Sequence, residues 1–201
     1  MPSITKGSDT DRANPLLKCH WAQDHRNPRD LCQLFDGLFA EAYNTRLVGG
    51  AEEPLYQVAE EAASANIIYF TRDYFASALH EVAHWCIAGE DRRRLTDYGY
   101  WYEPDGRSPE QQHDFEQVEV RPQALEWIFC CASRFPFRVS ADNVQSGNGA
   151  SPQFKQAIWR QVHSFCQSGL PERSQEFAAG LKGEFGGPEF LDPRHYRLDD
   201  L

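Results

Sequence analysis

"NIIYFTRDYFASALHEVAHWCIAGE", residues 66–90, joins a strand pattern to a helix pattern with almost no connecting residues. Residues 66–70 are mainly β-branched and aromatic, which predicts a buried strand. Residues 72–88 then place Phe75, Leu79, Val82 and Cys86 within about 60° of one another on a helix, so these side chains form one buried stripe. The stretch therefore predicts a fold in which a core helix directly follows a strand.

The same helix carries the pattern HExxH, formed by His80, Glu81 and His84. At about 100° per residue, the two histidines lie about 140° and 180° around the helix from Phe75, off the apolar stripe. They are one turn apart, so their imidazoles can converge on one ion. The pattern predicts a metal site; the alternative is a non-catalytic binding domain whose helix keeps the two histidines for structural reasons.

Two histidines leave a metal site incomplete, and three glutamates are candidates for the third ligand. Glu90 lies ten residues after His80 and reaches the ion only if Gly89 ends the helix in a left-handed turn. Glu116 and Glu119 lie downstream, before a predicted helix, and a separate segment often supplies the glutamate ligand of a zinc enzyme. Each of the three is also compatible with an ordinary surface charge.

Residue types alone allow two chemistries. Two histidines and one carboxylate hold zinc in hydrolases, where Glu81 would act as general base for peptide or nucleic-acid cleavage. They are also the ligands of Fe(II) in oxygenases, which keep open positions for O2. The formal net charge of −10 argues against a nucleic-acid partner and against an anionic membrane, and favours a cationic partner.

The rest of the chain predicts a single α+β domain with a small mixed sheet. We expect a disordered leader at 1–15, a catalytic domain at 16–190 and a C-terminal tail at 191–201. Further expected elements are a helix at 29–44, strands at 45–50 and 98–106, a helix start at Ser108 and Pro109, and helices at 122–135, 152–168 and 171–182. The stretch between residues 50 and 66 is expected to be a connection.

Two further features concern the cellular setting. No stretch approaches the roughly 20 apolar residues that span a bilayer, and the N-terminus lacks the apolar core of a signal peptide, so we expect a cytoplasmic protein. The six cysteines show no CxxC spacing, and two of them, Cys130 and Cys131, are adjacent. We therefore expect buried thiols rather than a zinc knuckle or disulfides.

Three segments together resemble the elongation factor P hydroxylase family: "HEVAHWCIAG", "GYWYEPDGR" and "VEVRPQALEW". The resemblance runs from about residue 29 to 185. It implies a non-haem Fe(II) enzyme, an O2-dependent monooxygenase, that hydroxylates the β-lysylated lysine of elongation factor P. It also implies a fold similar to that of a bacterial metal-dependent endoribonuclease, with a zincin-like metal helix after a strand. The source of the electrons is not specified.

Carried over to this sequence, the resemblance implies roles for particular residues. His80 and His84 match the histidine pair, and Glu119 is the favoured carboxylate ligand, with Glu116 and then Glu90 as alternatives. Glu81 would orient a metal-bound water or a histidine. Glu116, if it is not a ligand, would receive the substrate ammonium. Aromatic residues of the second segment would form walls around the cationic lysyl-lysine side chain through cation–π contacts; they are Tyr98, Tyr100, Trp101 and Tyr102.

Overall fold

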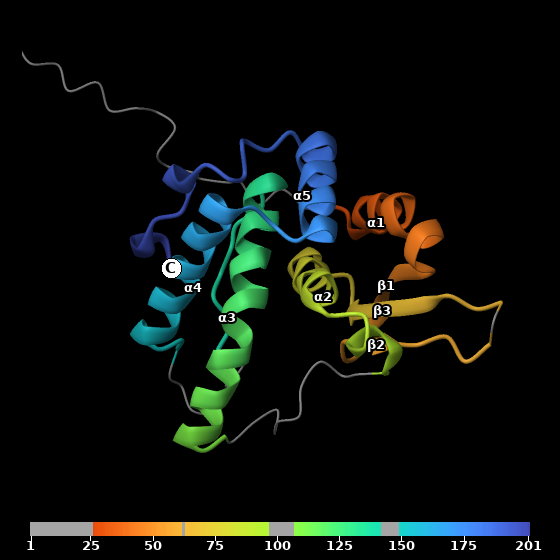
Figure 1. The fold of residues 1–201 in the computed structure, drawn as a ribbon, viewed down its shortest axis with the longest axis horizontal. Helices are drawn as coiled ribbons and strands as arrows, with labels where there is room; N and C mark the ends of the chain where they lie inside the picture. Colours follow the sequence, from red (N-terminus) through yellow and green to blue (C-terminus); the bar gives the residue numbers. More distant parts are fainter. Residues whose placement is uncertain (1–25, 62, 97–106, 142–148) are drawn as a thin grey trace, which may run out of the picture.

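Strand β3 (Asn66–Thr71) lies at the centre of a three-stranded sheet with the order β1-β3-β2 (Figure 1). Strand β1 (Thr45–Ala51) runs parallel to β3, and β2 (Leu55–Gln57) runs antiparallel to it. The expected mixed sheet and its first and central strands are thus confirmed. Residues 55–57 were expected to belong to a connection, and this prediction was wrong because they form β2. The three residues are only half buried and give no alternating apolar pattern that would indicate a strand.

The structure, a computed structural model, describes residues 26–61, 63–96, 107–141 and 149–201. The predicted leader at 1–15 and the predicted strand at 98–106 lie outside these residues. Within them, the helices agree with most of the sequence expectations. They are α1 (Pro28–Tyr43), α2 (Phe75–Ile87), α3 (Pro109–Ala132), α4 (Pro152–Ser168) and α5 (Glu172–Phe185), with single turns η2 (Arg92–Arg94), η3 (Pro193–His195) and η4 (Leu198–Asp200).

Helix α3 begins at the predicted start and runs on without interruption into the helix expected at 122–135. The Ser108 side chain accepts a hydrogen bond from the Gln111 amide at 3.2 Å, and the Gln111 side chain accepts one from the Ser108 amide at 2.8 Å, which forms a capping box. Pro122 lies inside the helix and donates no hydrogen bond to Val118. The residues that follow Pro122 are buried almost without exception, and this packing keeps the helix continuous.

Helix α2 occupies the middle of the molecule, between the sheet and α3 (Figure 1). It packs against β3 on one side and α3 on the other, while α1 covers β1, and α4 and α5 pack on α3. The predicted stripe of Phe75, Leu79, Val82 and Cys86 is buried. Because Ala78, Ala83 and Trp85 are buried as well, most of the α2 surface lies within the core.

The segment after α5 packs onto the rest of the domain. Phe190 and Tyr196 are buried, and the Tyr196 ring contacts Trp127 of α3 with a centroid separation of 5.2 Å. The Trp159 indole of α4 donates to the Tyr196 carbonyl at 3.0 Å. This segment therefore connects the outer faces of α3 and α4.

The thiols and the hydropathy of the helices agree with the sequence expectations as far as the structure describes them. Cys86 and Cys130 are buried, and Cys32, Cys131 and Cys166 are half buried; all five are free thiols. None of the helices in the described ranges combines the length and the apolar character that crossing a bilayer requires.

Candidate metal centre

Helix α2 places His80 and His84 side by side, one turn apart. Their Nε2 atoms are 3.1 Å apart and their ring centroids are 4.7 Å apart. Each side chain is 21% exposed, so the pair lies off the buried stripe, as the helical arithmetic predicts. The pair does not face open solvent, however, because α3 packs beside it.

Helix α3 brings Glu119 to the histidine pair. Its side chain is 1% exposed, with Oε1 3.2 Å from His84 Nε2 and Oε2 3.7 Å from His80 Nε2. One donor atom from each of the three residues lies within 4.8 Å of the others, and this is the group that could hold a metal ion among the described residues. The two helices thus bring together residues that are about 40 positions apart in the sequence.

Two further residues of α3 contact this group. Glu126 Oε2 accepts a hydrogen bond from His80 Nδ1 at 2.8 Å, and Gln123 Nε2 donates to Glu119 Oε2 at 3.0 Å. Because Glu126 accepts from Nδ1, Nε2 is the His80 nitrogen that faces His84 and Glu119, and it is the atom that would bind a metal in place of its proton. Neither residue is predicted from the sequence, although Glu119, Gln123 and Glu126 share one face of α3 at helical spacing.

The electrostatics of the group favour a positive charge between the two helices. Burial by itself would lower the pKa of His80, but the carboxylates of Glu119, Glu126 and Glu81 outweigh it and raise the pKa to about 10. Burial and the charges of His80 and Arg92 lower the pKa of His84 well below its ordinary value. His84 is therefore a neutral imidazole, which is the form that binds a metal.

The spacing of the donor atoms can be compared with that of ligands around one ion. Nitrogen and oxygen ligands at about 2.1 Å from an ion, separated by tetrahedral or octahedral angles, lie about 3.0 to 3.4 Å from one another. The His80–His84 and His84–Glu119 separations of 3.1 Å and 3.2 Å fall within this range. The separation of 3.7 Å between His80 Nε2 and Glu119 Oε2 lies slightly above this range, so the donor set fits a divalent cation after a small adjustment of the Glu119 side chain.

The structure places the other candidate ligands elsewhere. Helix α2 ends at Ile87, the chain leaves it in an extended conformation at Ala88, and Gly89 does not adopt a positive φ. The left-handed turn expected at Gly89 is therefore absent. The Glu90 side chain is 74% exposed and forms an ion pair with Arg94.

Glu116 and Glu81 also lie outside the three-residue group. Glu116 is buried and accepts a hydrogen bond from the Ser151 hydroxyl at 2.7 Å, at the start of α4. Glu81 is half buried on α2, close enough to His80 to influence its pKa. The predicted substrate residues Tyr98, Tyr100, Trp101 and Tyr102 lie outside the described residues.

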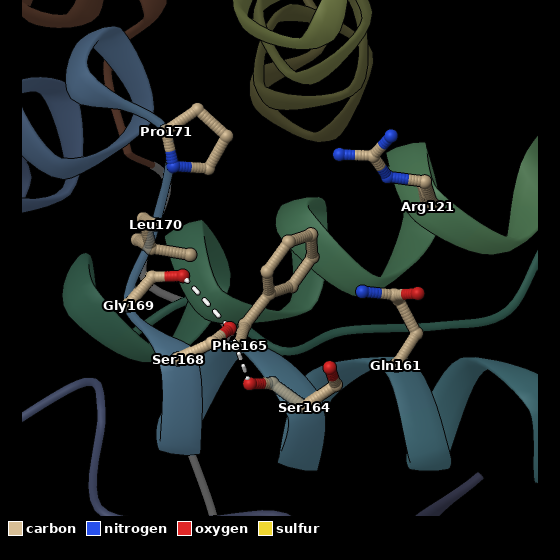
Figure 2. A pocket seen from close by; sticks show the side chains of 8 residues that line it. All are labelled: Arg121, Gln161, Ser164, Phe165, Ser168, Gly169, Leu170 and Pro171. Carbon is tan, nitrogen blue, oxygen red and sulfur yellow. Dashed lines mark hydrogen bonds between the residues drawn. The ribbon is translucent and has the colours of Figure 1, made fainter.

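A surface hollow of about 530 Å³ opens where α3, α4 and the α4–α5 connection meet (Figure 2). Arg121 of α3 lies on one side of it and Gly169, Leu170 and Pro171 on the other, toward α5, with Phe165 of α4 between them. None of the three donor side chains lines this hollow.

Two comparisons with known proteins bear on the whole domain. Residues 34–195 match the family described as "Elongation factor P hydroxylase". The chain is also 51% identical, over 152 residues, to the "Elongation factor P lysine hydroxylase" of Haemophilus influenzae. This alignment covers 76% of the chain and 85% of the relative. Both matches extend over β3, α2 and α3, so they include all three residues of the metal-ligand group.

Proposed function

The chain belongs to the elongation factor P hydroxylase family, and from this premise we propose that it hydroxylates the β-lysylated lysine of elongation factor P. The relative in Haemophilus influenzae carries the corresponding name. The site of reaction would be a non-haem Fe(II) centre held by His80, His84 and Glu119. The observation that carries the proposal is the convergence of these three donors between α2 and α3.

The residues around the donors have distinct tasks in this proposal. Bound Fe(II) would supply the activation of O2, for which a two-histidine, one-carboxylate ligand set leaves open positions. Glu126 keeps His80 in the tautomer that presents Nε2, and the closely packed helices keep the carboxylate of Glu119 away from bulk water. Glu81 is proposed to orient a metal-bound water or His80.

The substrate side of the site also belongs to the proposal. The lysyl-lysine side chain is long and cationic, and Tyr98, Tyr100, Trp101 and Tyr102 remain predicted walls around it. The hydroxyl and the amide of Ser151 donate to the two oxygens of Glu116 at 2.7 Å and 3.5 Å, and a contact of Glu116 with the substrate ammonium remains a prediction. Because translation factors work in the cytoplasm, we propose that the reaction takes place there.

The expected likeness to metal-dependent endoribonucleases and zincins is supported by one feature of the chain. The HExxH residues lie on α2, which directly follows strand β3. The same feature is the basis of the alternative reading as a zinc hydrolase with Glu81 as general base. The domain limits at 16–190, with the tail at 191–201, likewise remain predictions.

Metal analysis and product mass together test the proposed function. Protein purified without oxygen is expected to contain iron, and with β-lysylated elongation factor P and a reductant it should add one oxygen atom to the substrate. His80→Ala, His84→Ala and Glu119→Ala should each lose the iron and the mass gain. Glu90→Ala, which removes an exposed carboxylate, is the matched control and should keep both.

Other outcomes would contradict the proposal in different ways. Tightly bound zinc together with cleavage of a peptide or an RNA would favour the hydrolase. Activity that persists in Glu119→Ala but is lost in Glu90→Ala would show that the third ligand is assigned wrongly. A folded protein that binds no metal would favour a non-catalytic binding domain.

A further inference from the structure

Gln123 of α3 is a buried amide whose hydrogen-bonding groups are all engaged. It is 1% exposed and lies one helical turn after Glu119. Its Nε2 donates to Glu119 Oε2 at 3.0 Å and to the Ser140 carbonyl at 2.8 Å, and its Oε1 accepts from the Ser140 amide at 3.1 Å. Because a glutamine amide has two donor protons, both are used and its orientation is determined.

The two oxygens of Glu119 consequently have different neighbours. Oε2 accepts from Gln123 at 3.0 Å and lies 3.7 Å from His80 Nε2, whereas Oε1 lies closer to the histidine pair, 3.2 Å from His84 Nε2. We propose that Gln123 is a positioning residue that makes Glu119 present a single oxygen, Oε1, to the metal. This inference rests on the metal site proposed above and assigns the way in which its carboxylate is used.

The number of carboxylate oxygens on the metal matters for the proposed reaction. A carboxylate that binds through both oxygens occupies one more position on the ion, and the oxygenase ligand set depends on positions left open. A hydrogen bond from an amide to one carboxylate oxygen stabilises binding through the other. Gln123 therefore favours one-oxygen binding without adding charge to the site.

The main-chain segment that Gln123 contacts is itself anchored to the first turns of α3. The Arg107 guanidinium donates to the Ala141 carbonyl at 3.0 Å, and Gln112 Nε2 donates to the same carbonyl at 3.3 Å. The Arg107 guanidinium also lies 4.2 Å from the centroid of the Phe115 ring. Gln123 thus links the carboxylate of Glu119 to the main chain of Ser140, and the hydrogen bonds to the neighbouring Ala141 carbonyl hold this main chain in place.

Gln112 provides a matched control for Gln123. Both are glutamines of α3 that donate to the 140–141 segment, but only Gln123 contacts Glu119.

We would titrate wild type, Gln123→Met and Gln112→Met with Fe(II) without oxygen, and with Co(II), against a competing chelator. Gln123→Met should lower the metal affinity about 10- to 100-fold. Its cobalt absorption spectrum should also change as the second carboxylate oxygen binds, whereas Gln112→Met should match the wild type in both measurements.

Three results would overturn the inference. One is an unchanged affinity and cobalt spectrum in folded Gln123→Met; another is an equal change in Gln112→Met, which would assign the effect to the 140–141 segment alone. If Gln123→Met does not fold, Gln123→Asn replaces it, because this shorter amide cannot reach both Glu119 and Ser140. The third result is a Gln123→Asn protein with the metal affinity and the cobalt spectrum of the wild type. If instead the wild type binds no metal, or Glu119→Ala binds as well as the wild type, the proposed metal site itself fails.

Discussion

Glu126 is the residue whose substitution should report most directly on the orientation of His80. Its carboxylate accepts the Nδ1 proton of His80 at 2.8 Å, and it is 7% exposed. Glu126→Gln can still accept this hydrogen bond, but it removes the negative charge that strengthens His80 as a ligand. We expect the metal affinity to fall about tenfold or more while the fold is retained. Chelator competition measures the affinity, and circular dichroism measures the fold.

The control for Glu126→Gln is Glu90→Gln, which makes the same chemical change at a side chain that is 74% exposed. The control should bind metal like the wild type, because an exposed charge is screened by solvent. An equal loss of affinity in both variants would assign the effect to net charge rather than to the contact with His80.

The residues of the site differ in how far the sequence predicts them. The spacing of His80 and His84 within one helix is sufficient to place them together, whereas Glu119 is preferred over Glu90 only through the family resemblance. Gln123 and Glu126 are missed because the expected helix begins at Pro122, after Glu119, so the three residues are not expected on one helix face. In the continuous helix α3, all three lie on the face that contacts α2.

At the scale of elements, Arg173 of α5 holds the C-terminal end of the histidine helix. Its guanidinium donates to the carbonyls of Trp85, Cys86 and Ala88 at 3.0, 3.0 and 2.6 Å. It also lies over the Trp85 and Tyr43 rings, 4.7 Å and 5.4 Å from their centroids. The last carbonyls of a helix have no partner within the helix and carry partial negative charge, so a cation at this position stabilises α2.

Arg173→Leu should therefore lower the free energy of unfolding by about 2 to 3 kcal/mol, since it removes charged hydrogen bonds to carbonyls that are partly withdrawn from water. Arg173→Lys keeps the charge but loses the planar contact with several carbonyls, and we expect an intermediate loss. Urea unfolding measures both, with Arg160→Leu on the exposed face of α4 as control. A stability of Arg173→Leu equal to that of the control would contradict this role.

At the scale of the whole molecule, the order of strand and helices was largely predictable, but their pairing was not. The strand and the helix between Asn66 and Ile87 can be predicted from the local sequence, because strand and helix patterns depend on neighbours within a few residues. The contact between α2 and α3 joins residues about 40 positions apart, and a single sequence contains no local pattern for it. The same holds for β2, which is recognisable only through its pairing with β3.

The final prediction concerns the point where the chain crosses the end of α3. A Cβ atom at Gly187 would overlap the main-chain carbonyl of Ala132, and the residues beyond Gly187 include buried Tyr196. Gly187→Ala should push this segment off α3 and lower the free energy of unfolding by about 3 kcal/mol or more. Gly183→Ala makes the same change inside α5, where nothing lies within 4 Å of the new Cβ, and should raise stability by about 0.5 to 1 kcal/mol. Thermal and urea unfolding measure the stability of both variants. A Gly187→Ala protein as stable as the wild type would show that the chain at residue 187 can move away from the Ala132 carbonyl at little cost.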